Sequence, residues 1–111
     1  MKVLDLSLKK QWFDVMVTGE KTIEYRKTGK WINSRLCHTD GTEKQYDLIK
    51  FVNGYGADKP YFICKYDGVT LNTEQHTLRF SNGHDIEVAI GDTMIFLGEI
   101  IERGNIKANA V

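Results

Sequence analysis

The sequence predicts a small, mainly β domain with short α-helices, an α+β chain folded into a closed or nearly closed barrel. Several short stretches have strand character and are separated by frequent turn residues. One stretch near the N-terminus has apolar residues at helical spacing. A length of 111 residues fits one domain. We therefore expect about six strands with one or two N-terminal helices, residues 1–103 forming the domain and residues 104–111 a polar tail.

The N-terminal third contains the elements that precede and include the most polar strand. Residues 4–8 alternate apolar and polar side chains, which predicts a strand with one buried face. Apolar residues within 12–17 recur at helical spacing, and Gly19 is suited to end that helix. Residues 21–27 then have a strand pattern, and residues 31–36 predict a short second helix.

The rest of the chain alternates strands with glycine turns. The Asn53-Gly54-Tyr55-Gly56 stretch predicts a loop, and Asn82-Gly83 is the strongest hairpin signal in the chain. Asp67-Gly68 bends or ends a strand, and Gly98 indicates a bulge or a barrel corner within the last one. The strands expected around these turns cover residues 46–52, 61–66, 76–80, 84–90 and 93–102.

Charge and cysteine content narrow the classes of function. Lysine and arginine total 15, as do aspartate and glutamate, so we do not expect the surface as a whole to bind polyanions. A local basic groove is compatible with this balance of charges. Cys37 and Cys64 are expected to be free thiols, and neither has the spacing of a metal site. Asp5 and Ser7 interrupt the N-terminal apolar residues, so we expect no signal peptide, no membrane span and a cytoplasmic protein.

A cluster of charges within residues 21–26 is the main candidate site. In an extended strand Glu24 and Arg26 share one face, while Ile23 and Tyr25 share the other. Lys21, at the loop end, can reach the space beside Glu24 and Arg26. Arg26 offers a planar fork for phosphate, and Glu24 can orient it or accept from a base amine. Lys21 can bind phosphate or, if desolvated, act as a base or nucleophile. The simpler interpretation is a surface ion pair.

Other residues are candidates to complete a ligand-binding cleft. Arg35 can add a second cation, Asn53 can contact a base edge, and Tyr55 can stack on an unpaired base. The alternatives are a solvated helix face for Arg35 and an ordinary Asn-Gly turn with a packing tyrosine. Trp12 and Trp31 both lie on apolar periodic faces, so we expect them in the core rather than as stacking platforms.

The stretch from Gly19 to Arg26 resembles the motif of the ASCH domain family. That family has a Gly-x-Lys-x-x-Glu-x-Arg pattern just after a first helix. Residues 31–36, 53–55 and 96–100 are also similar to the short ASCH proteins of bacteria and phages, and the resemblance spans roughly residues 3–101. The four motif positions are matched by Gly19, Lys21, Glu24 and Arg26.

The resemblance implies a PUA-like β-barrel, a fold shared with RNA-modification domains. ASCH domains are expected to bind or act on RNA. Some relatives are small amidohydrolases that remove the acetyl group from N4-acetylcytidine, and a few are ribonucleases. The amidohydrolase branch uses a lysine, a threonine three residues later and a more distant glutamate. Lys21 matches the lysine, whereas Glu24 stands in the position of the threonine.

Three hypotheses about function follow from the residues and the resemblance together. The first is an RNA- or nucleotide-binding domain whose cleft holds an anionic ligand around Lys21, Glu24 and Arg26. The second is a small hydrolase acting on a modified nucleoside or on RNA, with Lys21 and Glu24 as catalytic groups. The third is a protein-interaction or inhibitor domain. In each case we expect no cofactor, no metal and no membrane, and a monomer or weak dimer.

Overall fold

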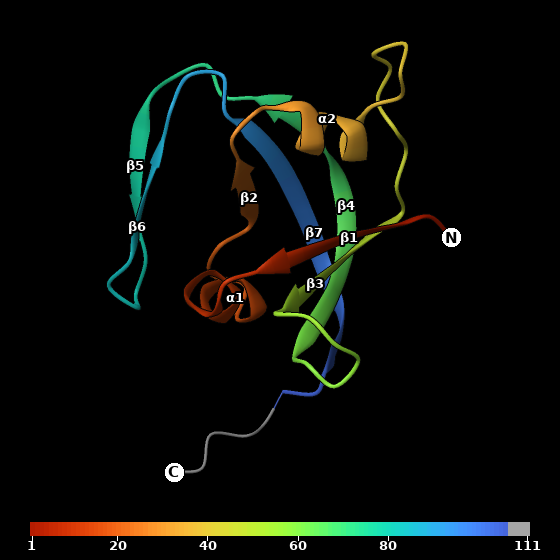
Figure 1. The fold of residues 1–111 in the computed structure, drawn as a ribbon. Coiled ribbons are helices and arrows are strands. Elements are labelled where there is room, and N and C mark those ends of the chain that lie inside the picture. The colour runs from red at the N-terminus through yellow and green to blue at the C-terminus, as the bar shows by residue number, and fades with distance from the viewer. Residues whose placement is uncertain (107–111) are drawn as a thin grey trace.

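The computed structural model describes residues 1–106, over which the chain forms seven strands and two helices in an α+β arrangement (Figure 1). The expected mainly β class is confirmed. Residues 107–111 of the expected polar tail lie outside the described residues. In chain order the elements are β1 (Val3–Leu8), α1 (Lys10–Val17), β2 (Ile23–Arg26), α2 (Lys30–Leu36), β3 (Leu48–Asn53), β4 (Tyr61–Leu71), β5 (His76–Arg79), β6 (Asp85–Val88) and β7 (Thr93–Gly104).

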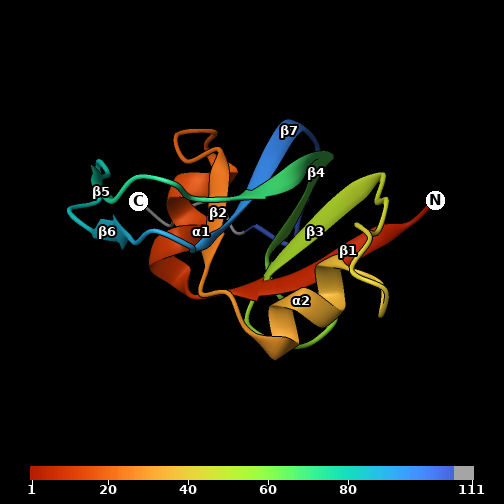
Figure 2. The same cartoon turned by 90° about the horizontal axis from the view of Figure 1, so that it is seen from above.

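Five of the strands form one curled sheet, and the other two form a separate hairpin. The sheet order is β1-β3-β4-β7-β2, so β1 and β2 are its two edge strands. β1 runs parallel to β3, while the other neighbours are antiparallel. The sheet curls into a half-barrel, which brings its two edges toward each other (Figure 2). This curl is what positions the candidate site, because residues from both edges contribute to it.

Two glycines allow the longest strand pair, β4 and β7, to bend. The pairing of these strands shifts register near Cys64 and again before Val69, so Asp67-Gly68 bends the strand rather than ending it. Gly68 has a φ of +102°, which favours glycine. A Cβ atom at Gly98 would lie 3.0 Å from the Cβ atom of Lys65. The expected bulge at Gly98 is therefore confirmed, and close strand contact explains why glycine is required there.

The core lies between the concave face of the sheet and the two helices. Phe51 and Phe62, register partners on β3 and β4, stack with ring centroids 5.1 Å apart. Phe13 from α1 packs against Phe62 at 5.4 Å. From α2, Ile32 and Leu36 are buried in the same cluster. Both helices therefore bury apolar residues against the sheet.

The β5–β6 hairpin lies beside β2, apart from the five-stranded sheet, and contacts α1 (Figures 1 and 2). The turn at Asn82-Gly83 joins its strands, as expected, and Gly83 has a φ of +85°. The Glu20 carboxylate accepts hydrogen bonds from the backbone N–H and the hydroxyl of Ser81. The Trp12 ring meets the Phe80 ring edge-on, at a centroid distance of 6.2 Å. The hairpin thus rests on the helix that precedes the motif.

Two details differ from the sequence expectations: the position of Trp31 and the end of β7. Trp31 is 57% exposed, so its assignment to the core is wrong; α2 turns Ile32 and Leu36 inward and leaves Trp31 on its outer side. β7 continues to Gly104, two residues beyond the expected end of the strand and into the first residue of the expected tail, because it stays paired with β4. Cys37 and Cys64 are both free, and Cys64 is buried. Within residues 1–106 no helix is long and apolar enough to cross a bilayer.

Candidate functional site

A tight turn after α1 directs the Lys21 side chain inward. Gly19, with a φ of +88°, follows the last helical turn and donates its N–H to the carbonyl of Met16. The N–H of Lys21 then donates to the carbonyl of Val15 at 2.9 Å. These bonds reverse the chain before β2 begins. Lys21, two residues before β2, is consequently only 3% exposed, and its side chain lies beside Met16 of α1.

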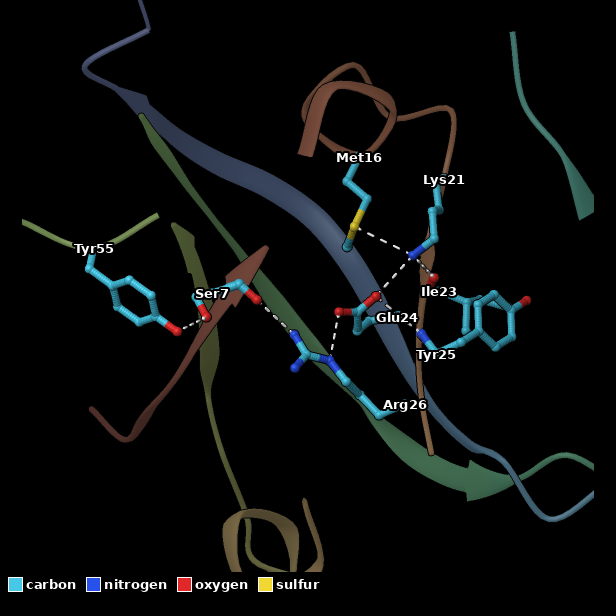
Figure 3. Close-up of polar contacts among 8 residues, drawn as sticks. All are labelled: Ser7, Met16, Lys21, Ile23, Glu24, Tyr25, Arg26 and Tyr55. Atoms are coloured by element: carbon cyan, nitrogen blue, oxygen red, sulfur yellow. Dashed lines mark hydrogen bonds and ion pairs between the residues drawn. The ribbon is translucent and has the colours of Figure 1, made fainter. Parts of the chain in front are cut away.

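The Lys21 ammonium is held by three acceptors at the base of β2 (Figure 3). It donates to the carbonyl oxygen of Ile23 at 2.7 Å and to Oε1 of Glu24 at 3.0 Å. A weaker contact joins it to the sulfur of Met16 at 3.5 Å. An ammonium has three N–H donors, so these partners match its capacity.

Glu24 is the centre of the cluster and is 5% exposed. Its register partner on β7 is Ile95, which is fully buried, so residue 24 must face the interior of the sheet. One carboxylate oxygen accepts from Lys21 and from the backbone N–H of Tyr25, and the other accepts from Arg26. The interpretation of a surface ion pair is therefore wrong for Glu24, because this carboxylate lies on the buried face of the half-barrel.

Arg26 joins the cluster to the opposite edge of the sheet. Its Nε donates to Oε2 of Glu24 at 2.9 Å, and its Nη2 donates to the carbonyl oxygen of Ser7 at 2.8 Å (Figure 3). The side chain remains 25% exposed. A guanidinium has five N–H donors, so donors remain for a ligand after these two bonds.

The charges of this triad, defined as Lys21, Glu24 and Arg26, sum to +1 when all three groups are ionised. Burial is the main cause that lowers the pKa of the Lys21 ammonium below its ordinary value, and the Arg26 charge lowers it further. The Glu24 carboxylate acts in the opposite direction by attracting the charged form. The triad is therefore a buried ion network with an excess positive charge on its exposed side, at Arg26.

A hollow of about 330 Å³ opens above Glu24 and Arg26. We call it the motif hollow. Lys9 lines it as a further cation, and Trp12 contributes an aromatic wall. Trp12 is half-buried rather than fully in the core, so its expected core role holds only in part. The residues lining the motif hollow are Ser7, Leu8, Lys9, Trp12, Glu24, Tyr25, Arg26 and Ile86.

The other expected ligand-binding residues, Arg35, Asn53 and Tyr55, do not line the motif hollow. Tyr55 is 85% exposed, and its hydroxyl accepts a long 3.4 Å hydrogen bond from the Ser7 hydroxyl. Asn53 pairs in register with Leu8, next to the motif hollow, but is not among its lining residues. Arg35 is exposed on α2, and its guanidinium contacts the carbonyl of Asp5 at 3.5 Å. The structure thus brings Tyr55 toward the Ser7 side of the site and leaves Arg35 outside the motif hollow.

Sequence reasoning missed Ser7 and assigned Lys9 no firm role. Both lie on the segment from β1 to α1, which reaches the triad only because the sheet curls. No local pattern indicates that the Ser7 carbonyl would bind Arg26. Among residues 1–106, no group of three or more histidine, cysteine, aspartate or glutamate side chains is arranged to hold a metal ion.

Comparison of the chain with protein-family models, with curated proteins and with solved structures finds no match. The geometry described above therefore carries the functional argument.

Proposed function

We propose that this protein binds single-stranded RNA or a nucleotide, with one base and its phosphate accommodated at the motif hollow. The observation that carries the proposal is the buried triad, whose uncompensated positive charge reaches the surface through Arg26. Burying Lys21 and Glu24, and partly burying Arg26, costs desolvation free energy that an apolar core would not, and such clusters gather at functional sites. The resemblance of residues 19–26 to the ASCH motif supports the same proposal.

The shape and lining of the motif hollow suit one nucleotide unit. Its volume of about 330 Å³ is near the small end of ligand sites, which matches a single base rather than a duplex. Trp12 supplies an apolar ring of the kind on which unpaired bases stack. Arg26 and Lys9 supply cations suited to a phosphate, and Glu24 supplies an acceptor for a base amine.

Trp12 fluorescence provides a direct test of binding. The chain has two tryptophans, so Trp31→Phe leaves Trp12 as the sole reporter beside the hollow. We expect a mixed-sequence RNA oligomer to quench this signal, with an affinity that weakens as salt rises and a shallow slope, because few phosphates are engaged. Arg26→Ala in the same background should weaken binding about tenfold or more, through loss of charge-assisted bonds.

Lys65→Ala is the matched control, because it removes one positive charge from an exposed pair with Glu99 on the outside of the sheet. It should bind like the unmodified protein. Circular dichroism at the assay temperature must show that the Arg26 variant is folded. Equal affinities of the Arg26 variant and the control, or an unmodified protein that binds neither RNA nor mononucleotides, would remove the proposal.

A second candidate function is hydrolysis of a modified nucleoside. The lowered pKa of the Lys21 ammonium beside a carboxylate favours it, because a less protonated amine is a better base or nucleophile. Lys21 does not line the motif hollow, so this function requires its amine to exchange one of its three partners for the substrate. Incubation with N4-acetylcytidine should then release acetate, and Lys21→Met should abolish the release. Sustained absence of turnover at high enzyme concentration, on this nucleoside and on mixed RNA, would contradict the hydrolase function and leave RNA or nucleotide binding as the only proposed function.

A further inference from the structure

A concavity larger than the motif hollow lies away from the triad, between α2 and the adjoining ends of β4 and β7. Its volume is about 1020 Å³, roughly three times the 330 Å³ of the motif hollow. We call it the α2 cleft; its lining includes Thr28, Leu36, Cys37, Lys44, Leu71 and Thr93. Thr93 is the register partner of Arg26, so the α2 cleft begins one strand away from the triad without including any of its members.

The floor of the α2 cleft is apolar. Leu36 is buried, Val69 is half-buried, and Leu71 is 52% exposed although it is a large apolar side chain. An apolar side chain left this open within a concave site favours an occupant with an apolar body. Thr28 and Thr93 border this floor and bond each other through their hydroxyls at 2.7 Å. Hydroxyl groups at the edge of an apolar surface can bond a polar ligand group without a charge cost.

The rim of the α2 cleft is cationic. Lys30 at the start of α2 and Lys44 in the loop after it both line the cleft, and none of the lining residues within 1–106 is acidic. Lys44 is half-buried and donates one hydrogen bond to the Ser34 carbonyl at 2.8 Å, which holds its ammonium at the cleft. Its remaining N–H donors can bind an anion. In a chain with equal numbers of basic and acidic residues, this charge is a local excess.

We propose that the α2 cleft binds a phosphate monoester of nucleoside size, with the apolar ring on Val69 and Leu71 and the phosphate between Lys30 and Lys44. The two lysines at the rim complement a negatively charged group, and the apolar floor complements a ring system. Lysine binds phosphate as a point charge, which suits a terminal phosphate with no fixed orientation. This second site is independent of the motif hollow, because the two share no lining residue.

Cys37 makes the cleft testable without any introduced label site. Cys37 lines the α2 cleft and is half-buried, whereas Cys64 is fully buried and burial raises the pKa of the Cys64 thiol to about 12, which suppresses its reactivity. A thiol reagent should therefore label Cys37 first, and Cys37→Ser should remove that fast phase. We expect AMP to slow the labelling of Cys37 strongly, while adenosine and inorganic phosphate separately slow it far less.

Two sets of variants separate this site from the motif hollow. Lys30→Ala combined with Lys44→Ala should raise the AMP concentration that gives half protection by about tenfold or more, because the charge-assisted bonds to phosphate are lost. Lys10→Ala combined with Lys65→Ala removes the same charge elsewhere and should leave protection unchanged. Arg26→Ala should also leave the AMP protection of Cys37 unchanged. Failure of the proposed RNA binding at the motif hollow would therefore be distinguishable from failure of AMP binding at the α2 cleft.

Three results would overturn the assignment. One is labelling of Cys37 at the same rate with and without millimolar AMP. Another is equal protection by adenosine and AMP, which would remove the role of the phosphate. The third is unchanged AMP protection in the double variant of Lys30 and Lys44, once circular dichroism has shown that it is folded.

Discussion

The guanidinium of Arg26 donates a 2.8 Å hydrogen bond to the carbonyl oxygen of Ser7, and these two residues belong to opposite edge strands of the same sheet. The bond therefore links the two edges of the half-barrel. Because the same side chain also donates a hydrogen bond to the buried Glu24 carboxylate, one arginine connects the curl of the sheet to the ion network in its interior. A ligand that binds Arg26 acts on the link between the two edges.

Removal of Arg26 should reduce stability as well as binding. Arg26→Ala loses hydrogen bonds to a buried carboxylate and to the Ser7 carbonyl, so we expect the free energy of unfolding to fall by about 2–3 kcal/mol. Arg26→Lys keeps the charge but loses the planar fork, and it should recover only part of this loss. Urea denaturation of the three proteins measures the differences. A free energy for Arg26→Ala within about 0.5 kcal/mol of the unmodified protein would contradict a linking role.

The buried ammonium of Lys21 should make the free energy of unfolding depend on pH in alkaline solution. Its pKa is lowered in the folded protein, mainly by desolvation, so between that lowered pKa and its ordinary value of 10.5 the unfolded chain binds more protons. Stability from this group must then rise as pH rises through that window. Lys21→Met lacks the group and serves as the reference.

The free energy of unfolding of the unmodified protein, minus that of Lys21→Met, should therefore increase as pH rises from the lowered pKa of Lys21 toward 10.5. Urea denaturation at several pH values gives both terms, and the subtraction cancels titration of groups that the variant retains. A difference that stays flat or falls would show that the ammonium is as readily protonated in the folded chain as in the unfolded one.

The local features of the fold could be predicted from sequence because short stretches of chain encode them. The hairpin at Asn82-Gly83, the end of α1 near Gly19 and the bulge at Gly98 each depend on one glycine and its neighbours. The proximity of Glu24 and Arg26 follows from strand alternation alone. Lys21 joins them because the turn after α1 is short.

The inward orientation of Glu24 and the α2 cleft could not be predicted in this way. Alternation defines two faces of β2, but the pairing of Glu24 with Ile95 on β7 decides which face is inside. A carboxylate facing the core contradicts the usual preference for apolar residues there, so polarity indicates the wrong face. The α2 cleft combines α2, the following loop and the end of β4, and no single segment has a distinctive pattern.

Gly98 should be intolerant of any side chain. A Cβ atom there would lie 3.0 Å from the Cβ atom of Lys65 and 3.1 Å from Oδ2 of Asp67, closer than ordinary contacts. We expect Gly98→Ala to lower the free energy of unfolding by about 1–3 kcal/mol through this overpacking. Gly29→Ala is the matched control, because a Cβ atom at Gly29 meets open space and its backbone is extended. Thermal or urea denaturation that ranks the two variants equally would contradict the tight β4–β7 contact.

The attachment of the β5–β6 hairpin to the rest of the fold should weaken at acidic pH. Hydrogen bonds from the hydroxyl and the backbone N–H of Ser81 lower the pKa of the Glu20 carboxyl below its ordinary value of 4.5. The carboxylate form therefore stabilises the docked hairpin above the unfolded pKa, and this contribution is lost as pH falls through the lower, folded pKa. We expect hydrogen exchange in β5 and β6 to accelerate in that acidic range, relative to exchange in β3.

Glu20→Gln tests the cause of this pH dependence, because the amide keeps the shape but cannot ionise. Its hairpin should exchange faster at neutral pH and show little further change on acidification. Asp40→Asn is the matched control: hydrogen bonds from Thr42 also lower the pKa of the Asp40 carboxyl, but those contacts lie in the loop after α2. The same acid response in Glu20→Gln as in the unmodified protein would show that another group anchors the hairpin.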